Sequence, residues 1–183
     1  MKLKLLLLNV MISVFAYAQL VYDQDDSMVK LTLSEVSYMG LYPDDSDVHL
    51  NMTFGNAMDV ESFVNESCTN SEKRLVYTIA KSSNSNSRAI QVHMSYGWLP
   101  SNLSISVTAS QATGGAGTLG LPSNTVVLSA TAKNLITGIG SGYTGNTATS
   151  GHCLQYKAYI NSLSGLVFTI NKVVQVTYTL VEE

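Results

Sequence analysis

The sequence is poor in basic residues, in cysteine and in apolar runs long enough to cross a membrane. Ten Lys and Arg stand against 13 Asp and Glu in 183 residues, and the formal net charge is −3. Nucleic acids and anionic membranes attract basic patches, which a charge-poor, mildly acidic chain does not supply. Beyond residue 18, no apolar run approaches the ~20 residues that a transmembrane helix needs. The composition argues against nucleic acid as a partner and against a membrane span.

Motifs of known catalytic centres are also missing. The chain has no Gly-x-Ser-x-Gly elbow to present a nucleophile, and its histidines, His49, His93 and His152, do not have the spacing of zinc ligands. The glycines of Gly140–Gly145 match the dinucleotide-binding pattern GxGxxG. The residues that follow show no helical periodicity, so we interpret this segment as a loop between strands. We therefore predict that the protein is not an enzyme.

An export signal occupies the first 18 residues. Lys2 and Lys4 precede a mainly apolar run over residues 5–15, and Ala16-Tyr17-Ala18 follows as a small-residue cleavage site. We predict a signal peptide over residues 1–18 and one domain over residues 19–183. Its removal leaves 8 basic and 13 acidic residues, a net charge of −5. The protein is expected to be secreted, periplasmic or at the cell surface.

The two cysteines, Cys68 and Cys153, both lie in the predicted mature chain. Two thiols in one exported domain usually pair, so we predict a Cys68–Cys153 disulfide. The alternative is two separate thiols. A metal site is a weaker reading because the chain contains no C-x-x-C pair.

Apolar and polar residues alternate over many short segments, as on strands with one buried and one solvated face. Helical periodicity is nearly absent, and Ser82–Ser87 is expected to form the tip of a hairpin. We predict an all-β fold, a single immunoglobulin-like antiparallel β-sandwich of about nine strands. The clearest alternating runs are residues 48–54, 90–96, 103–109, 154–160 and 174–180, and weaker runs lie at 29–38, 75–79, 126–128 and 166–170.

Two groups of residues are candidates for binding. Asp44, Asp45 and Asp47 are close enough in sequence to hold Ca²⁺, which prefers oxygen ligands, although a solvated acidic turn is the alternative. No other cofactor is expected. Trp98 lies in a predicted loop beside Tyr96, where it is able to stack on a sugar ring or anchor a partner. The alternative is that Trp98 packs over one end of the sandwich.

The export signal, the alternating strands and the closing run Val-Gln-Val-Thr-Tyr-Thr-Leu-Val over residues 174–181 resemble exported pilin-like β-sandwich proteins of Gram-negative bacteria. This group includes fimbrial subunits and spore-coat-protein-U-like domains. The resemblance implies an immunoglobulin-like fold and a role in surface assembly, and it carries over no catalytic residues. We expect a non-catalytic structural or adhesion module, such as a fimbrial-type subunit, with surface proteins or glycans as partners. The alternative is a carbohydrate-binding module that uses Trp98 and Tyr96.

Overall fold

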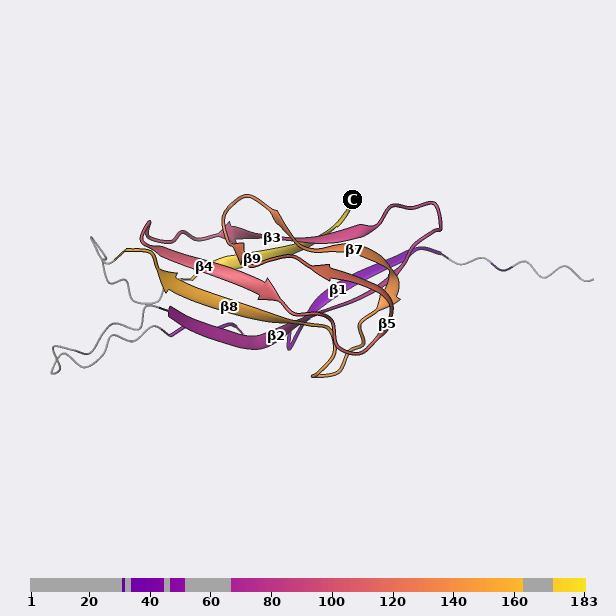
Figure 1. Ribbon diagram of the computed structural model, residues 1–183, viewed down its shortest axis with the longest axis horizontal. Helices are drawn as coiled ribbons and strands as arrows, with labels where there is room; N and C mark the ends of the chain where they lie inside the picture. Colours follow the sequence, from indigo (N-terminus) through magenta and orange to yellow (C-terminus); the bar gives the residue numbers. More distant parts are fainter. Residues whose placement is uncertain (1–30, 32–33, 45–46, 52–66, 163–172) are drawn as a thin grey trace, which may run out of the picture. The chain divides into compact units, whose positions relative to one another are not determined.

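The computed structural model describes residues 31, 34–44, 47–51, 67–162 and 173–183. Within these residues every regular element is a β-strand, and all the strands belong to the compact unit of residues 34–183. The all-β prediction is therefore confirmed. The strands are β1 (Val36–Tyr42), β2 (Ser67–Ala80), β3 (Arg88–Tyr96), β4 (Leu103–Ala109), β5 (Ala116–Pro122), β6 (Val126–Val127), β7 (Lys133–Tyr143), β8 (His152–Ile160) and β9 (Gln175–Glu182), most of them labelled in Figure 1.

Hydrogen bonding joins the nine strands into one antiparallel sheet. The main path runs β6-β4-β8-β2-β7-β3-β9, while β1 pairs with β2 and β5 pairs with β7. Strand β2 is the centre of this arrangement because its 14 residues have three neighbouring strands. Its first half pairs with β8, its second half with β1, and its last residues with β7. The sequence predicted two sheets packed face to face, and the observed strands are instead linked continuously.

The sheet curls so that strands far apart in this order face each other across the core. The path places β2, β7 and β3 between β8 and β9, yet the Tyr156 hydroxyl of β8 lies 2.6 Å from the Tyr178 hydroxyl of β9. Burying each large apolar side chain of the interior stabilises the fold by about 1.5–3 kcal/mol. The most buried of these are Leu75, Tyr77, Ile90, Val92, Val107, Leu135, Ile136, Ile139 and Leu154.

Regular alternation located most of the strands. The predicted runs at 90–96, 103–109, 154–160 and 174–180 coincide with β3, β4, β8 and β9, and the weaker runs at 75–79 and 126–128 lie within β2 and around β6. A turn forms at Ser82–Ser87, where the Ser85 amide donates to the Ser82 carbonyl at 3.1 Å. It is not the tip of a hairpin as predicted, because β7 lies between β2 and β3 in the sheet. The Glu35 carboxylate fixes this turn by accepting from the Ser82 amide and the Ser85 hydroxyl, both at 2.7 Å.

Three predictions about strands were wrong. Val48–Asn51 is not a strand, and among the described residues of the run at 29–38 only those from Val36 onward, in β1, are extended into a strand. The GxGxxG segment was predicted to be a loop, but Gly140–Tyr143 forms the end of β7, with Thr144 and Gly145 beyond it. Strand β5 was not predicted at all. The predicted run at 166–170, residues 52–54 and the signal peptide lie outside the described residues.

Strand β9 takes its predicted place in the sheet but lies at an edge. It pairs with β3 along its length and has no second partner among the described strands. Its apolar side chains, Val174, Val176, Tyr178 and Leu180, pack against the core and are only partly buried. The deep burial expected for this face is therefore incomplete.

Candidate functional site

The predicted disulfide is absent, because the sheet separates its two cysteines. Cys68 lies opposite Ala158, which is five residues further along β8 than Cys153. Five residues of a strand span about 16 Å, whereas the Cα atoms of a disulfide lie within about 7 Å of each other. The side chains also leave opposite faces: Cys68 packs against the core, while Cys153 pairs with Arg74 on the outer face. Both thiols are free.

The three predicted calcium ligands do not form a described site. Asp44 and Asp47 are exposed, and Asp45 lies outside the described residues. Within the described part of the chain, no three His, Cys, Asp or Glu side chains are grouped so that they could hold a metal ion. The calcium hypothesis therefore stays a prediction.

The Tyr96–Trp98 segment presents its aromatic rings to solvent. Tyr96 is 71% exposed and Trp98 is 62% exposed, so Trp98 does not pack over the end of the fold as the alternative reading expected. Gly97 between them has φ +89° and approaches the residues before β9 so closely that an added Cβ would lie 2.5 Å from the Val173 carbonyl oxygen. The backbone of this segment is thus held against the chain at residue 173 while both rings remain outside.

His152 is a structural residue of the core. It is fully buried on β8, and its Nδ1 lies 2.8 Å from the Ser110 carbonyl oxygen. Because a carbonyl only accepts, Nδ1 carries a proton, and Nε2 lies 2.9 Å from the Tyr77 hydroxyl oxygen. The Tyr77 hydroxyl donates to the Leu119 carbonyl. With both nitrogens engaged and no solvent access, this histidine is not placed to take a proton from a substrate.

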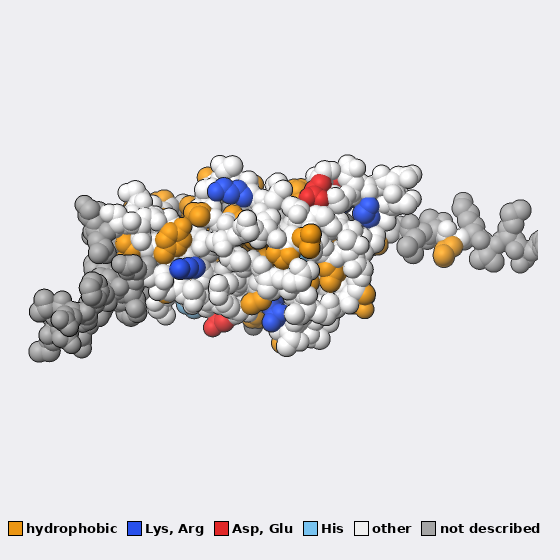
Figure 2. Space-filling model, viewed as in Figure 1, with side chains coloured by type: hydrophobic (Ala, Val, Ile, Leu, Met, Phe, Trp, Pro, Cys, Tyr) orange, Lys and Arg blue, Asp and Glu red, His pale blue; other side chains and the backbone are white. Residues whose placement is uncertain are grey.

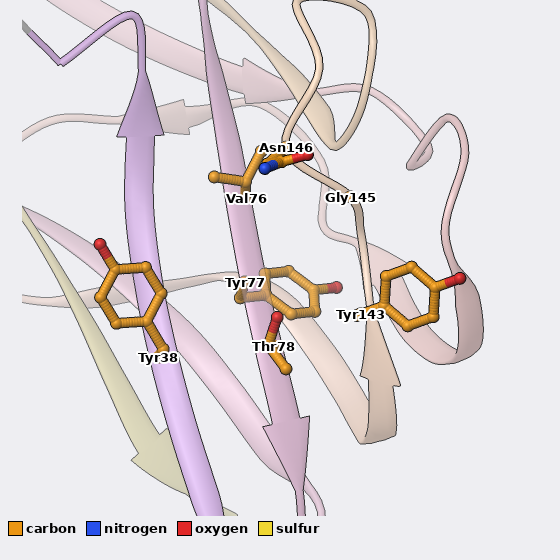
Figure 3. A pocket seen from close by; sticks show the side chains of 7 residues that line it. All are labelled: Tyr38, Val76, Tyr77, Thr78, Tyr143, Gly145 and Asn146. Atoms are coloured by element: carbon orange, nitrogen blue, oxygen red, sulfur yellow. The ribbon is translucent and has the colours of Figure 1, made fainter.

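A pocket of about 270 Å³ lies elsewhere on the sheet, over the second half of β2. It is lined by Tyr38, Val76, Tyr77, Thr78, Tyr143, Gly145 and Asn146, as Figure 3 shows. Tyr38 comes from β1 and Tyr143 from the end of β7, and their side chains are 69% and 52% exposed. Sequence reasoning missed both residues, since Tyr38 lay in an irregular run and Tyr143 in a presumed loop.

The surface around these features carries few charges. On the face drawn in Figure 2, Lys, Arg, Asp and Glu side chains are scattered singly, and neutral polar and apolar atoms fill the space between them. None of the seven residues that line the pocket is charged. Within the described residues, no helix has the length and apolar character to cross a membrane.

Comparison with known proteins yields no relative. No family model matches the chain, and neither does any curated protein or solved structure. Arguments about function therefore rest on the residues themselves.

Proposed function

We propose that this chain is a non-catalytic, exported module that acts at the cell surface or outside the cell, in adhesion or in a structural assembly such as a fimbria. The export pattern of residues 1–18 and the resemblance to pilin-like proteins support this proposal. The observation that carries it is the exposure of Tyr96 and Trp98 on an anchored segment of backbone.

Exposed aromatic rings of this kind suit recognition of a partner. Tyrosine and tryptophan are enriched among the residues that contribute most to binding, because they remove a large area from water at a low cost in side-chain entropy. The close approach of Gly97 to Val173 fixes the backbone between the two rings. A fixed backbone lowers the ordering cost of binding. The segment is therefore suited to adhesion, while the buried His152 supports the fold.

Adhesion by this segment is tested with Trp98→Ala and Tyr96→Ala in the exported protein. Attachment of cells that display the chain, or of beads coated with it, is expected to fall severalfold in each variant. Leu121→Ala is the matched control, because Leu121 is 68% exposed on β5 and lies outside the segment. Equal attachment of the wild type, both aromatic variants and the control would show that Tyr96 and Trp98 are not the adhesive surface.

Export is tested separately. Fractionation of cells that make the full chain is expected to place it outside the cytoplasm, with a mature N-terminus at or near Gln19 by intact mass. A protein that remains in the cytoplasm with residues 1–18 attached would contradict the proposal. A fimbrial-type role further predicts fibres containing the chain in electron micrographs of the producing cells.

The second candidate is a carbohydrate-binding module that uses Trp98 and Tyr96, and the exposure of both rings favours it. Aromatic faces stack on the C–H faces of sugar rings. Binding on a glycan array that Trp98→Ala abolishes, with the fold intact by circular dichroism, would favour this candidate over a protein partner. If the protein binds no glycan on the array but the displaying cells or coated beads still attach, a protein partner is favoured.

A further inference from the structure

Three pocket residues, together with Ala116 beside them, form a row that crosses four strands of the sheet. Tyr38 on β1 is in register with Thr78 on β2, Thr78 with Tyr143 on β7, and Tyr143 with Ala116 on β5. Residues in lateral register point to the same face of a sheet. All four are exposed, so this is the outer face. The row therefore alternates a large ring with a small side chain, which leaves both rings accessible from above.

The two rings are about two strand spacings apart, or roughly 10 Å between their Cα atoms. Figure 3 shows them on either side of Thr78, with a face of each ring turned toward the viewer. The Tyr38 ring lies along β1 over Gly40, where an added Cβ would be 3.8 Å from the Tyr38 hydroxyl oxygen and 3.9 Å from a ring carbon, which is ordinary van der Waals contact.

Gly145 also lines the pocket, just beyond the end of β7 at Tyr143. Below the row, Tyr77 and Thr144 are buried and join β2 to the chain after β7, since the Thr144 amide donates to the Tyr77 carbonyl at 2.9 Å. The Thr144 hydroxyl also accepts from the Tyr77 amide at 2.9 Å. The two rings are therefore carried on backbone that is fixed by hydrogen bonds.

The chemistry of this surface selects a neutral, flat and partly polar ligand. Its lining has no charged side chain, so it offers an ionic ligand no counter-charge. Two aromatic faces turned to the same side suit rings that present apolar C–H faces, while the tyrosine hydroxyls, Thr78 and Asn146 provide hydrogen bonds at the rims. A β-1,4-linked polysaccharide has these properties, because it is a flat ribbon of neutral rings with hydroxyls along its edges.

We propose that Tyr38, Thr78 and Tyr143 form a binding platform for a neutral β-linked polysaccharide. Such a ribbon lies across β1, β2 and β7 and stacks one sugar ring on each tyrosine. This platform is distinct from the Tyr96–Trp98 segment, which lies at the opposite end of β3 from the turn that joins β2 to β3. The inference rests on the proposed function only in that export brings the chain into contact with extracellular glycans.

The test is depletion of the purified mature chain by microcrystalline cellulose and by chitin. Wild-type protein is expected to bind at least one of them, with little effect of added salt because the ligand is neutral. Tyr38→Ala and Tyr143→Ala are each expected to weaken binding about tenfold, or about 1.4 kcal/mol. Tyr38→Phe and Tyr143→Phe keep the rings and are expected to stay within about twofold of the wild type.

Tyr42→Ala is the matched control, since Tyr42 lies on the same strand, is 40% exposed and does not line the pocket. Circular dichroism and thermal unfolding establish that each variant folds. The proposal is overturned if the wild type binds neither polysaccharide, or if Tyr38→Ala and Tyr143→Ala bind as tightly as Tyr42→Ala. Loss of binding in Trp98→Ala alone would also overturn it, placing the glycan at the loop segment. Loss of self-association in the two tyrosine variants, without any polysaccharide binding, would assign this face to contacts between copies.

Discussion

The hydroxyl oxygens of Tyr156 on β8 and Tyr178 on β9 lie 2.6 Å apart and join the two strands across the interior. Burial raises the pKa of both phenols, and the neighbouring Tyr156 raises that of Tyr178 further. Both therefore stay protonated at pH values where an exposed tyrosine begins to ionise. The contact holds the edge strand β9 against a strand from which three other strands separate it in the sheet.

This pair predicts a non-additive response to substitution. Tyr156→Phe or Tyr178→Phe alone leaves one buried hydroxyl without its partner, and each is expected to lower the free energy of unfolding by about 1–3 kcal/mol. The double variant removes both hydroxyls and is expected to lose less than the sum of the two. Urea unfolding of the four proteins measures the coupling. Additive losses would show that the hydrogen bond contributes nothing of its own.

His152 predicts a loss of stability in mild acid. Burial lowers its pKa below the ordinary value of 6.5, although hydrogen bonding to backbone opposes this shift. The folded protein then binds fewer protons than the unfolded chain as the pH falls below about 6.5, so acid favours unfolding. The free energy of unfolding is expected to be at its full value above that pH and to decrease steadily below it.

The contribution of His152 is isolated with His152→Gln, measured by urea unfolding from neutral pH to pH 5. The variant is expected to be less stable at neutral pH by about 1–3 kcal/mol, because its hydrogen bonds to Ser110 and Tyr77 are disturbed. Its stability is also expected to change less between neutral pH and pH 5 than that of the wild type. Parallel pH curves for the two proteins would rule out His152 as the source of the acid sensitivity.

How far the sequence predicted the fold depended on regular alternation. Strands β3, β4, β8 and β9 alternate cleanly and were located to within a few residues. Strand β7 does not alternate, because Leu135 and Ile136 are adjacent and both buried, and its pairing with β3 shifts register there. Its glycines at 138, 140 and 142 further hid it, since glycine is depleted in strands. A β-bulge and close backbone contacts thus removed the signal that periodicity provides.

The binding platform could not be predicted from the sequence. Tyr38, Thr78 and Tyr143 are far apart along the chain, and only the register of β1, β2 and β7 brings them into one row. The exposed Trp98 was a candidate because a single tryptophan in a loop is conspicuous. The disulfide prediction failed for a related reason, because the number of cysteines says nothing about their positions in the sheet.

The cysteine geometry predicts two free thiols in the folded protein. The intact mass of the exported chain is expected to be unchanged by reduction and to increase by two alkyl groups after denaturation in the presence of an alkylating reagent. Cys68 is expected to react the more slowly of the two in the native state, because its burial raises the pKa of the thiol. A mass two hydrogens lower that reduction restores would demonstrate an internal disulfide and contradict the pairing of β2 with β8.

Two glycines in the β5–β7 pair allow the cost of steric crowding to be measured apart from the cost of backbone strain. Gly117 on β5 has φ +95°, and an added Cβ would lie 2.3 Å from the Ser141 carbonyl oxygen and 2.6 Å from the Gly142 Cα. Gly138 on β7 has φ +67°, but an added Cβ there meets no atom within 4 Å.

Gly138→Ala therefore adds only the cost of a left-handed conformation, expected to be about 1 kcal/mol. Gly117→Ala also forces β5 away from β7 and is expected to cost about 3 kcal/mol or more. Thermal and urea unfolding of the two variants provide the comparison, and equal losses would mean that β5 is not held against β7 at this distance.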